Sequence, residues 1–290
     1  MQDAPQPMLS VVIPMYQESS RIVPTLRDVI ECLGTRSSSC EVILVDDGST
    51  DDTSEVVKPH LFSVPRGPIA RVCLVTLTRN RGKGAAVREG LRAARGDRIL
   101  MMDADNAARL VEVDKLLPEM SGRVGIAVGS RSMPTSEIDA KGFRRITGLI
   151  FKIATGCLGL QLARDTQCGF KLYRSDVAAM VAERGLENRF AFDLEHLLLT
   201  TRAGLDVAEV GIRWRHVDGG QINPVIDGLK MLWQACRIRL RSYEIPRLEG
   251  RPAPVSASQV EAKPEGAGVA AAVVAGSEAP DSPGGSGQGS

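Results

Sequence analysis

Two aspartates that follow a short apolar run are the residues of this sequence best suited to hold a metal ion. Asp103 and Asp105 come directly after residues 98–102 and are separated by one alanine. Side chains two positions apart on an extended chain point to the same side, so both carboxylates face one spot. Two like charges held this close repel each other unless a cation lies beside them. Hard oxygen ligands suit Mg²⁺ or Mn²⁺, which keep open positions for diphosphate oxygens.

Polar residues also follow the first two apolar runs, at 9–13 and 41–45. They are Pro14, Tyr16 and Glu18 after the first run, and Asp46 and Asp47 after the second. Carboxylates there could bind base and ribose hydroxyls, and the aromatic ring could stack on a base. Taken alone, the string DDGS also fits a plain turn that leads into a helix N-cap at Ser49 or Thr50. The three clusters together favour a nucleotide site.

The elements that must position these clusters alternate along the first half of the chain. Apolar strands are predicted at 9–13, 41–45, 71–75, 98–102 and 124–128, with amphipathic helices ending at residue 33 and spanning 84–94. Strands separated by helices of this length predict βαβ units and a mostly parallel sheet flanked by helices. Ligands of such sheets bind beyond the carboxyl ends of the strands, which is where every cluster falls.

The second half differs in character. Residues 143–162 are apolar but carry basic residues, and could form an interfacial helix. A strand is predicted at 169–173, helices at 175–184 and 193–203, and a strand at 207–214. The last predicted helix, 224–242, is basic and would be attracted to anionic lipid. Its cations are Lys230, Arg237, Arg239 and Arg241.

Composition limits the classes of function. The 290 residues, 43% of them hydrophobic, suit one large α/β domain at 8–245, followed by a Pro/Gly/Ala/Ser-rich tail at 246–290 that we expect to be disordered. A net charge of +1 argues against a nucleic-acid partner. Neither a signal peptide nor a membrane-spanning run is evident, and the six scattered cysteines indicate reduced thiols. These features favour a cytoplasmic protein.

The motifs resemble family 2 glycosyltransferases, through the strings VVIPMYQE, VDDGSTDDT, NRGKGAAVREG, MMDADN and GSR. Within that family, DTQCGFKLY from Asp165 and FAFDLE from Phe190 resemble dolichyl-phosphate β-glucosyltransferases and related polyprenyl-phosphate sugar synthases. The resemblance implies a Rossmann-like GT-A fold and inverting transfer of a hexose. The donor would be UDP-glucose or a related nucleotide sugar, and the acceptor a polyprenyl or dolichyl phosphate at the cytoplasmic face of a membrane.

The resemblance also implies roles for individual residues. Pro14, Tyr16, Glu18, Asp46, Asp47, Lys83, Asp103 and His216 would bind the donor; Asp103 and Asp105 would hold Mg²⁺ or Mn²⁺; Arg131, Arg144 and Arg145 would meet the acceptor phosphate; and Asp105, Arg131, Asp165 and Asp193 would be catalytic. Two positions depart from relatives: Ala107 replaces a metal-binding Gln of dolichyl-phosphate mannose synthases, and Gln221 stands where relatives carry Lys. The second departure puts a phosphate contact in doubt.

The acceptor determines whether the reaction needs a base. A phosphate monoester is largely anionic at neutral pH and attacks without one, assisted by arginines that position it. A sugar or lipid hydroxyl would require a carboxylate base, and Asp193 or Glu195 could serve. A non-catalytic nucleotide-sugar-binding protein is a third possibility, which the intact Asp103 and Asp105 disfavour. His196 and Cys168 are interpreted as structural.

Overall fold

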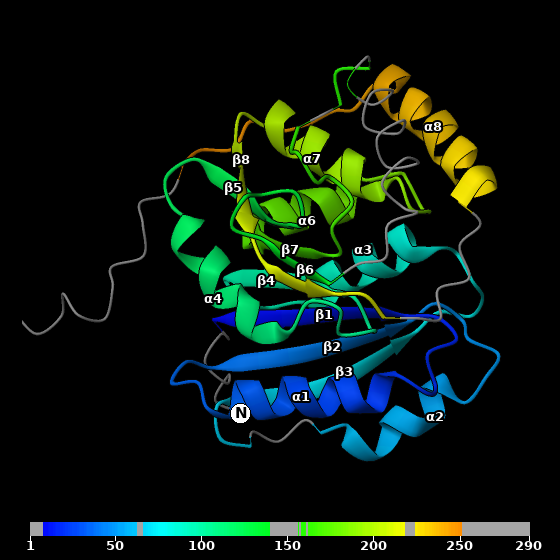
Figure 1. Ribbon diagram of the computed structural model, residues 1–290, viewed down its shortest axis with the longest axis vertical. Helices are drawn as coiled ribbons and strands as arrows, with labels where there is room; N and C mark the ends of the chain where they lie inside the picture. The colour runs from blue at the N-terminus through cyan, green and yellow to red at the C-terminus, as the bar shows by residue number, and fades with distance from the viewer. Residues whose placement is uncertain are drawn as a thin grey trace, which may run out of the picture. The chain divides into compact units, whose positions relative to one another are not determined.

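The computed structural model describes residues 8–62, 66–139, 156, 158–160, 162–217 and 224–250. At its centre is a seven-stranded sheet (Figure 1). Its strands are β1 (Leu9–Met15), β2 (Cys40–Asp46), β3 (Ile69–Thr76), β4 (Arg98–Met102), β5 (Val124–Ser130), β7 (Phe170–Arg174) and β8 (Asp206–Gly211). They are arranged in the order β3-β2-β1-β4-β7-β5-β8. The predicted mostly parallel sheet flanked by helices is confirmed.

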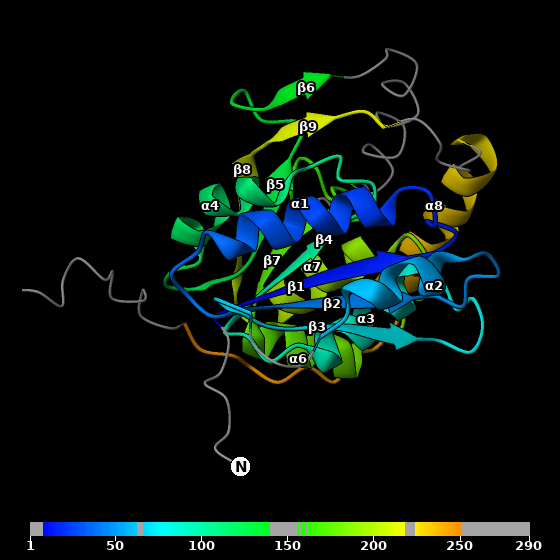
Figure 2. The ribbon, with the colours of Figure 1, turned by 90° about the horizontal axis from the view of Figure 1, so that it is seen from below.

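Helices cover both faces of this sheet. The α-helices are α1 (Ile22–Gly34), α2 (Thr53–Val57), α3 (Lys83–Ala93), α4 (Val113–Leu116), α6 (Ser175–Arg184), α7 (Phe192–Arg202) and α8 (Pro224–Leu240). Short 3₁₀ helices span Lys58–His60, Leu110–Glu112 and Leu117–Glu119. α1 and α4 lie on one face, and α3, α6 and α7 on the other (Figure 2). α3 packs on β1 and β2, and α7 packs on β5 and β8.

The central strands and α1 form for reasons visible in their sequences. All seven residues of β1 and of β2 are buried, which is typical of strands covered on both faces and explains their continuous apolar runs. α1 buries Ile22, Leu26, Val29 and Leu33, a spacing that places one apolar stripe against the sheet. Burial of such stripes, rather than helix propensity, provides most of the stability of a helix in a protein.

The order of the strands contains one feature that the sequence did not predict. β7 lies between β4 and β5 and runs antiparallel to both, with Met102 paired to Phe170. The amino end of β7 therefore lies at the same edge of the sheet as the carboxyl ends of β1, β2 and β4. This orientation brings the segment before Phe170 to the edge where ligands bind in sheets of this kind.

The strand predicted at 207–214 is in fact two strands. β8 ends at Gly211, and β9 (Arg213–Arg215) leaves the main sheet to pair in parallel with β6 (Glu137–Asp139). The buried Ile212 marks the break and donates its N–H to the carbonyl of Ser130 at 3.2 Å. The small β6–β9 sheet projects beside β5 and β8 (Figure 2).

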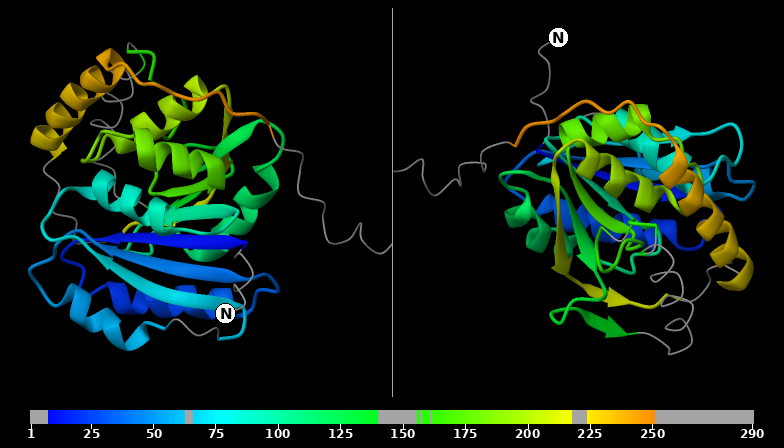
Figure 3. Two further views of the ribbon diagram at one scale, coloured as in Figure 1. Left: turned by 180° about the vertical axis from the view of Figure 1, so that it is seen from behind. Right: turned by 90° about the horizontal axis from the view of Figure 1, so that it is seen from above.

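The chain after α7 packs back on the domain. Leu194 and Leu198 of α7 form a small apolar cluster with Ala235 and Ile238 of α8, and Figure 3 shows α8 beside α7. The chain keeps contact with the domain beyond the predicted boundary at 245, because Leu248 donates its N–H to the carbonyl of Ala203 at 2.9 Å. Residues 251–290 lie outside the described residues, so disorder of the tail stays a prediction. Within the described ranges, none of the helices is long and apolar enough to cross a bilayer.

Candidate active site

The carboxyl edge of the sheet gathers the predicted site from both halves of the chain. β1, β2 and β4 deliver Tyr16, Asp46 and Asp103 at their carboxyl ends. Antiparallel β7 begins at this edge, so Asp103 donates its N–H to the carbonyl of Gly169 at 3.1 Å. The sequence predicted that the ends of β1, β2 and β4 lie at one edge of the sheet. The tertiary structure adds the segment before β7 to the same edge.

The Asp103–Asp105 pair meets a lysine from α3. Lys83 is the first residue of that helix, and its Nζ forms an ion pair with Oδ1 of Asp103. Oδ1 of Asp105 accepts the N–H of Ala107 at 3.0 Å, which orients the second carboxylate. The carboxylate of Asp103 occupies the space that a Cβ on Gly169 would need, so any larger residue here would displace that carboxylate.

Negative charge at this edge exceeds its compensation. Burial raises the pKa of Asp105, and the neighbouring Asp103 raises it further. Burial likewise raises the pKa of Glu18; Asp105 and Asp103 add to the rise, and Arg21 opposes it. Lys83 supplies one nearby cation: burial lowers its pKa, but Asp103 and Asp193 outweigh burial, and the net shift is upward. A site with this charge balance attracts cations.

The donor set fits a divalent metal that is shared with a substrate. Among the described residues, no group of three His, Cys, Asp or Glu side chains could enclose a metal by itself. Asp103 and Asp105 offer two carboxylates, which is the usual protein share of a Mg²⁺ site that substrate phosphates and water complete. Burial is the main reason why the pKa of Asp105 is raised, and the neighbouring Asp103 adds to it, so a bound cation would offset both effects.

The residues after β1 frame an open rim. Tyr16 is 44% exposed, as stacking of its ring on a base would require. Glu18 forms two hydrogen bonds with Arg21, at 2.7 and 2.8 Å, so this carboxylate is held and partly neutralised. Pro14 is buried within β1 and shapes the strand end rather than presenting a side chain.

Asp46 and Asp47 are both held by hydrogen bonds within the protein, and their role as donor ligands stays a prediction. Both are buried. Asp46 accepts the N–H and hydroxyl of Ser49, at 2.9 and 2.6 Å, and the hydroxyl of Ser54. These bonds form a turn after β2, but the N-cap predicted at Ser49 or Thr50 is wrong, because the N-cap residue of α2 is Asp52.

Asp47 ties the second strand to the loop before α3. Its two oxygens accept the backbone N–H groups of Arg81 and Gly82, each at 2.7 Å. Burial raises its pKa, and these two hydrogen bonds counteract the rise. The contact anchors the loop from which Lys83 reaches Asp103.

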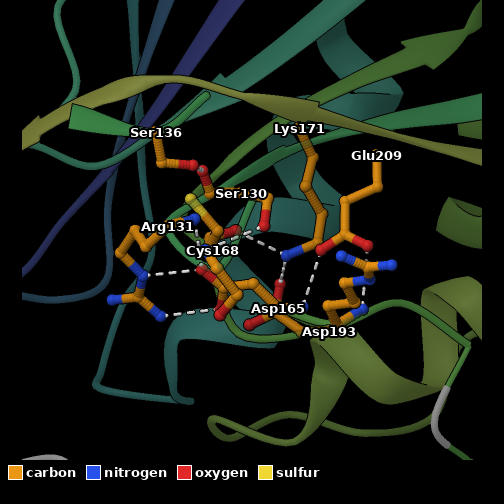
Figure 4. A network of polar contacts seen from close by, with 10 residues as sticks. Ser130, Arg131, Ser136, Asp165, Cys168, Lys171, Asp193 and Glu209 are labelled. Atoms are coloured by element: carbon orange, nitrogen blue, oxygen red, sulfur yellow. Dashed lines mark hydrogen bonds and ion pairs between the residues drawn. The ribbon is translucent and has the colours of Figure 1, made fainter. Parts of the chain in front are cut away.

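Arg131 and Asp165 form a bidentate pair at the carboxyl end of β5 (Figure 4). Nε and Nη2 of Arg131 donate to the two carboxylate oxygens at 2.8 and 2.9 Å, and the Arg131 backbone N–H adds a third bond at 2.9 Å. Burial alone would raise the pKa of Asp165, but Arg131 more than offsets it, so the pKa is lowered. The Arg131 side chain remains 33% exposed, and its guanidinium lies 5.4 Å from the Trp214 ring centroid. Asp165 is thus a residue that positions Arg131.

Lys171 and Asp193 form a second pair deeper in the same network (Figure 4). Lys171 is fully buried in β7, and its Nζ donates to Asp193 Oδ1 and, at 2.6 Å, to the carbonyl of Cys168. Burial raises the pKa of Asp193, while Lys171 and Lys83 lower it in part. Asp193 is therefore buried and engaged with Lys171 rather than open to a substrate.

The remaining candidates, on α7 and just before β7, are buried. Glu195 is fully buried and accepts the N–H groups of Leu186 and Glu187 and the hydroxyl of Tyr243. His196 is buried against Tyr173, and burial lowers its pKa well below the ordinary value. Burial raises the pKa of Cys168 to about 12, so its thiol stays protonated. The structural interpretation of His196 and Cys168 is confirmed.

His216 lies among the described residues, whereas two of the residues predicted to meet the acceptor phosphate do not. The ring centroid of His216, the residue after β9, lies 6.1 Å from that of Trp214, whose ring is also 5.4 Å from the Arg131 guanidinium. Arg215 of the same strand donates its N–H to the carbonyl of Ala107 at 2.9 Å, which places β9 next to the Asp103–Asp105 segment. Arg144, Arg145 and Gln221 lie outside the described residues.

Sequence reasoning missed three residues of the site. Lys171 was hidden in an apolar strand, although a lysine in the run FKLY is itself a signal of a buried pair. Glu209 of β8 accepts the N–H groups of Arg164 and Asp165, each at 2.9 Å, and so fixes the segment that holds Arg131. The sequence did not single out Arg21, because its partner Glu18 was predicted to bind the donor.

Comparisons with known proteins identify the family and support the fold. The family model "Glycosyl transferase family 2" matches residues 10–180. The chain is 36% identical over 252 residues to a dolichyl-phosphate beta-glucosyltransferase of Mus musculus, covering 82% of this chain and 77% of the relative. It is 34% identical to the Dictyostelium discoideum protein of that name, over 80% and 74% of the two chains. Among solved structures, glucosyl-3-phosphoglycerate synthase from Mycobacterium tuberculosis in complex with Mn²⁺, UDP-glucose and phosphoglyceric acid shares the fold, with a TM-score of 0.57, 18% identity, and coverage of 85% and 90%.

Proposed function

The chain belongs to glycosyltransferase family 2, and we propose that it transfers glucose from UDP-glucose to dolichyl phosphate or a related polyprenyl phosphate. It is a glycosyltransferase by family. The donor, the acceptor and the metal are our proposal. Its support is the similarity to dolichyl-phosphate β-glucosyltransferases together with the charge arrangement of the site.

One observation favours a phosphate acceptor over a hydroxyl. The two carboxylates that could serve as a general base, Asp193 and Glu195, are both buried and already engaged, the first by Lys171 and the second by three donors. A base must lie within hydrogen-bond reach of the proton that it removes. An acceptor phosphate brings its own negative charge and needs only cations that orient it.

Arg131 is the residue we assign to the acceptor phosphate. Asp165 holds its guanidinium by two parallel hydrogen bonds, and one third of the side chain remains exposed. A planar guanidinium presents five N–H donors, so two can hold the carboxylate while others meet phosphate oxygens. A cation fixed in advance loses little freedom when the acceptor binds, which favours a defined line of attack.

The donor side is assigned to the β1, β2 and β4 strand ends. Pro14, Tyr16, Glu18 and Asp46 would hold the nucleoside, and Asp103 would meet the ribose, as the family resemblance implies. Asp103 and Asp105 would hold Mg²⁺ or Mn²⁺, which would neutralise the diphosphate as it leaves. Lys83, already at Asp103, would add a second positive charge at the same place. Attack opposite the diphosphate inverts the anomeric centre and gives a β-linked product from an α-linked donor.

We further propose peripheral attachment to the cytoplasmic face of a membrane, where a polyprenyl phosphate keeps its tail in lipid. The support lies on α8. Trp233 is 60% exposed and Leu240 is 84% exposed, and the Arg237 guanidinium lies 4.5 Å from the Trp233 ring centroid. Aromatic and basic residues on one helix face are typical of helices that lie in a membrane interface.

The decisive test offers the purified protein four acceptors with labelled UDP-glucose and Mn²⁺. These are dolichyl phosphate, dolichol, a short water-soluble polyprenyl phosphate and 3-phosphoglycerate. We expect transfer to both polyprenyl phosphates and none to dolichol. Transfer to dolichol would support the hydroxyl alternative, and transfer to phosphoglycerate alone would exclude a lipid acceptor. A parallel panel of nucleotide sugars tests the choice of glucose.

A further inference from the structure

We infer that Tyr243 and Glu195 are positioning residues for Lys83, acting through the segment 186–188 that packs on the start of α3. This inference deepens the proposed function, because it rests on Lys83 as a donor-phosphate contact. Tyr243 follows α8, Glu195 lies on α7, and Lys83 lies on α3, so three separate parts of the chain meet in one line of contacts.

The first contact is between α3 and residues 187–188. Ala85 donates its N–H to the carbonyl of Asn188 at 3.2 Å. Arg88, one turn further along α3, donates to the carbonyl of Glu187 at 2.5 Å and to the side chain of Asn188. A Cβ on Gly84 would overlap the Glu187 carbonyl and lie 2.7 Å from Cβ of Phe192. The start of α3 is therefore seated directly on this segment, and a shift of the segment moves Lys83.

The second contact is between that segment and Glu195. The carboxylate accepts the N–H of Leu186 at 2.9 Å and the N–H of Glu187 at 2.8 Å. Glu195 has no exposure to solvent, so each of these bonds forms in a medium where it cannot be replaced by water. The carboxylate fixes the backbone of 186–187 and with it the carbonyls that α3 contacts.

The third contact reaches Glu195 from the chain after α8. The Tyr243 hydroxyl donates to Oε1 of Glu195 at 2.7 Å. Arg241 turns inward as well: its side chain is 21% exposed, and Nη1 lies 3.7 Å from carboxylate oxygens of both Glu187 and Glu195. Arg241 was predicted to face anionic lipid, and its position corrects that assignment. The acidic partners that draw it inward lie about fifty residues away in the sequence.

The position of Lys83 matters because its ammonium group contacts Asp103 through one carboxylate oxygen. Its Nζ forms the ion pair with Asp103 Oδ1, and the proposed diphosphate would lie at the same place. A displacement of about 1 Å in a positioning group can lower an enzymatic rate by about 100-fold. Residues that keep α3 seated therefore control how well Lys83 meets the donor.

The test compares Tyr243→Phe with Tyr173→Phe. Both variants remove one hydroxyl, and both hydroxyls bond to neighbouring residues of α7, Glu195 and His196 respectively. Only the first bond lies on the route to Lys83. In Tyr243→Phe we expect faster amide hydrogen exchange at residues 83–88. We also expect the affinity for UDP·Mn²⁺ to fall about 5-fold, because only part of the free energy of the lost charge-assisted hydrogen bond would reach Lys83. In Tyr173→Phe we expect a lower melting temperature with unchanged UDP affinity.

The hydrogen-exchange arm needs no ligand, so it separates this inference from the proposed function. If the unaltered protein fails to bind UDP·Mn²⁺, the proposed function is overturned, while exchange at 83–88 still decides the positioning role. Unchanged exchange at 83–88 in Tyr243→Phe would overturn the inference. Equal acceleration in both tyrosine variants would overturn it too, because that result would indicate general loosening. Gly84→Ala approaches the same contact from the other side and should reproduce the Tyr243→Phe pattern.

Discussion

The two sides of the active-site edge compensate their charges differently. At the ends of β1 and β4, Glu18, Asp103 and Asp105 share Arg21 and Lys83, and the pKa values of Glu18 and Asp105 are raised. Around β5 and β7, the cations Arg131 and Lys171 each have a dedicated carboxylate, Asp165 or Asp193. The first side leaves negative charge for a ligand to neutralise, whereas the second is neutral before any ligand arrives.

This difference separates what each side contributes to transfer. An under-compensated carboxylate cluster is expected to bind a cation and, through it, a diphosphate. A pre-paired arginine is expected to hold its position and to accept an anion without rearrangement. Substitutions on the first side should therefore affect function more than folding. Substitutions of Lys171 and Asp193, the buried pair of the second side, should affect folding more than function.

The largest expected effect is on the under-compensated side. Asp105→Ala should lower turnover by about 10³-fold, because a carboxylate ligand of the metal that supports the leaving diphosphate is lost. EDTA should do the same, and added Mn²⁺ should restore the unaltered protein only. Circular dichroism should show an intact fold. Full activity in chelator would contradict the metal assignment.

The next largest effect concerns the buried pair. Lys171→Met should lower the free energy of unfolding by about 3–5 kcal/mol, since Asp193 would remain buried without its partner. The double variant Lys171→Met/Asp193→Leu should recover most of that loss, because both charges are then gone. Urea unfolding of the two variants measures the difference. If the double variant were no more stable than the single one, the pair would owe its stability to something other than mutual neutralisation.

Arg131 should show a split between substrates. Arg131→Ala should raise the KM for the lipid phosphate about 10- to 100-fold, the range expected for a lost charge-assisted hydrogen bond. Nucleotide affinity measured by calorimetry should stay within a few-fold. Asp165→Asn serves as the companion variant, because it keeps the guanidinium but weakens its anchor, and should give a smaller increase in the same KM. A loss of nucleotide affinity with unchanged lipid KM would contradict the assignment.

The smallest expected effect is a gain of stability. Asp105→Asn should raise the melting temperature by roughly 2–4 °C at neutral pH, because it removes a charge that burial and Asp103 disfavour while keeping an acceptor for Ala107. A raised pKa means that ionisation of Asp105 opposes folding. The gain should therefore be present at pH above the raised folded value and disappear below 3.8, the ordinary value.

Asp28→Asn provides the opposite sign as a control. Its carboxylate is bound by Arg109, which lowers its pKa, so its charge stabilises the fold above pH 3.8 and the stabilisation is lost as pH falls. The neutral variant should melt at a lower temperature at neutral pH. Equal shifts in both variants would show that charge compensation does not distinguish the two sites.

Much of the fold could be predicted from local pattern. The bounds of β4 and α6 agree with the predicted 98–102 and 175–184, because an apolar run or a helical period fixes an element within a few residues of itself. The antiparallel β7 could not be predicted, since strand direction depends on where the chain returns to the sheet. The break at Ile212 was missed for a related reason: an apolar run indicates a strand but not which sheet it joins.

The sequence by itself determined which reactive side chains are present and at which edge of the sheet they lie. Carboxylates at successive strand ends indicated a nucleotide and metal site, because parallel strands present their carboxyl ends together. Only the tertiary structure decided which charges are compensated. Arg131 meets Asp165, 34 positions away, and Tyr243 meets Glu195, 48 positions away. Such pairs are selected by strand order and by packing between distant segments, and local spacing carries no information about either. Carboxylates are therefore under-compensated at Asp103 and Asp105 but held by hydrogen bonds within the protein at Asp46, Asp47 and Glu195.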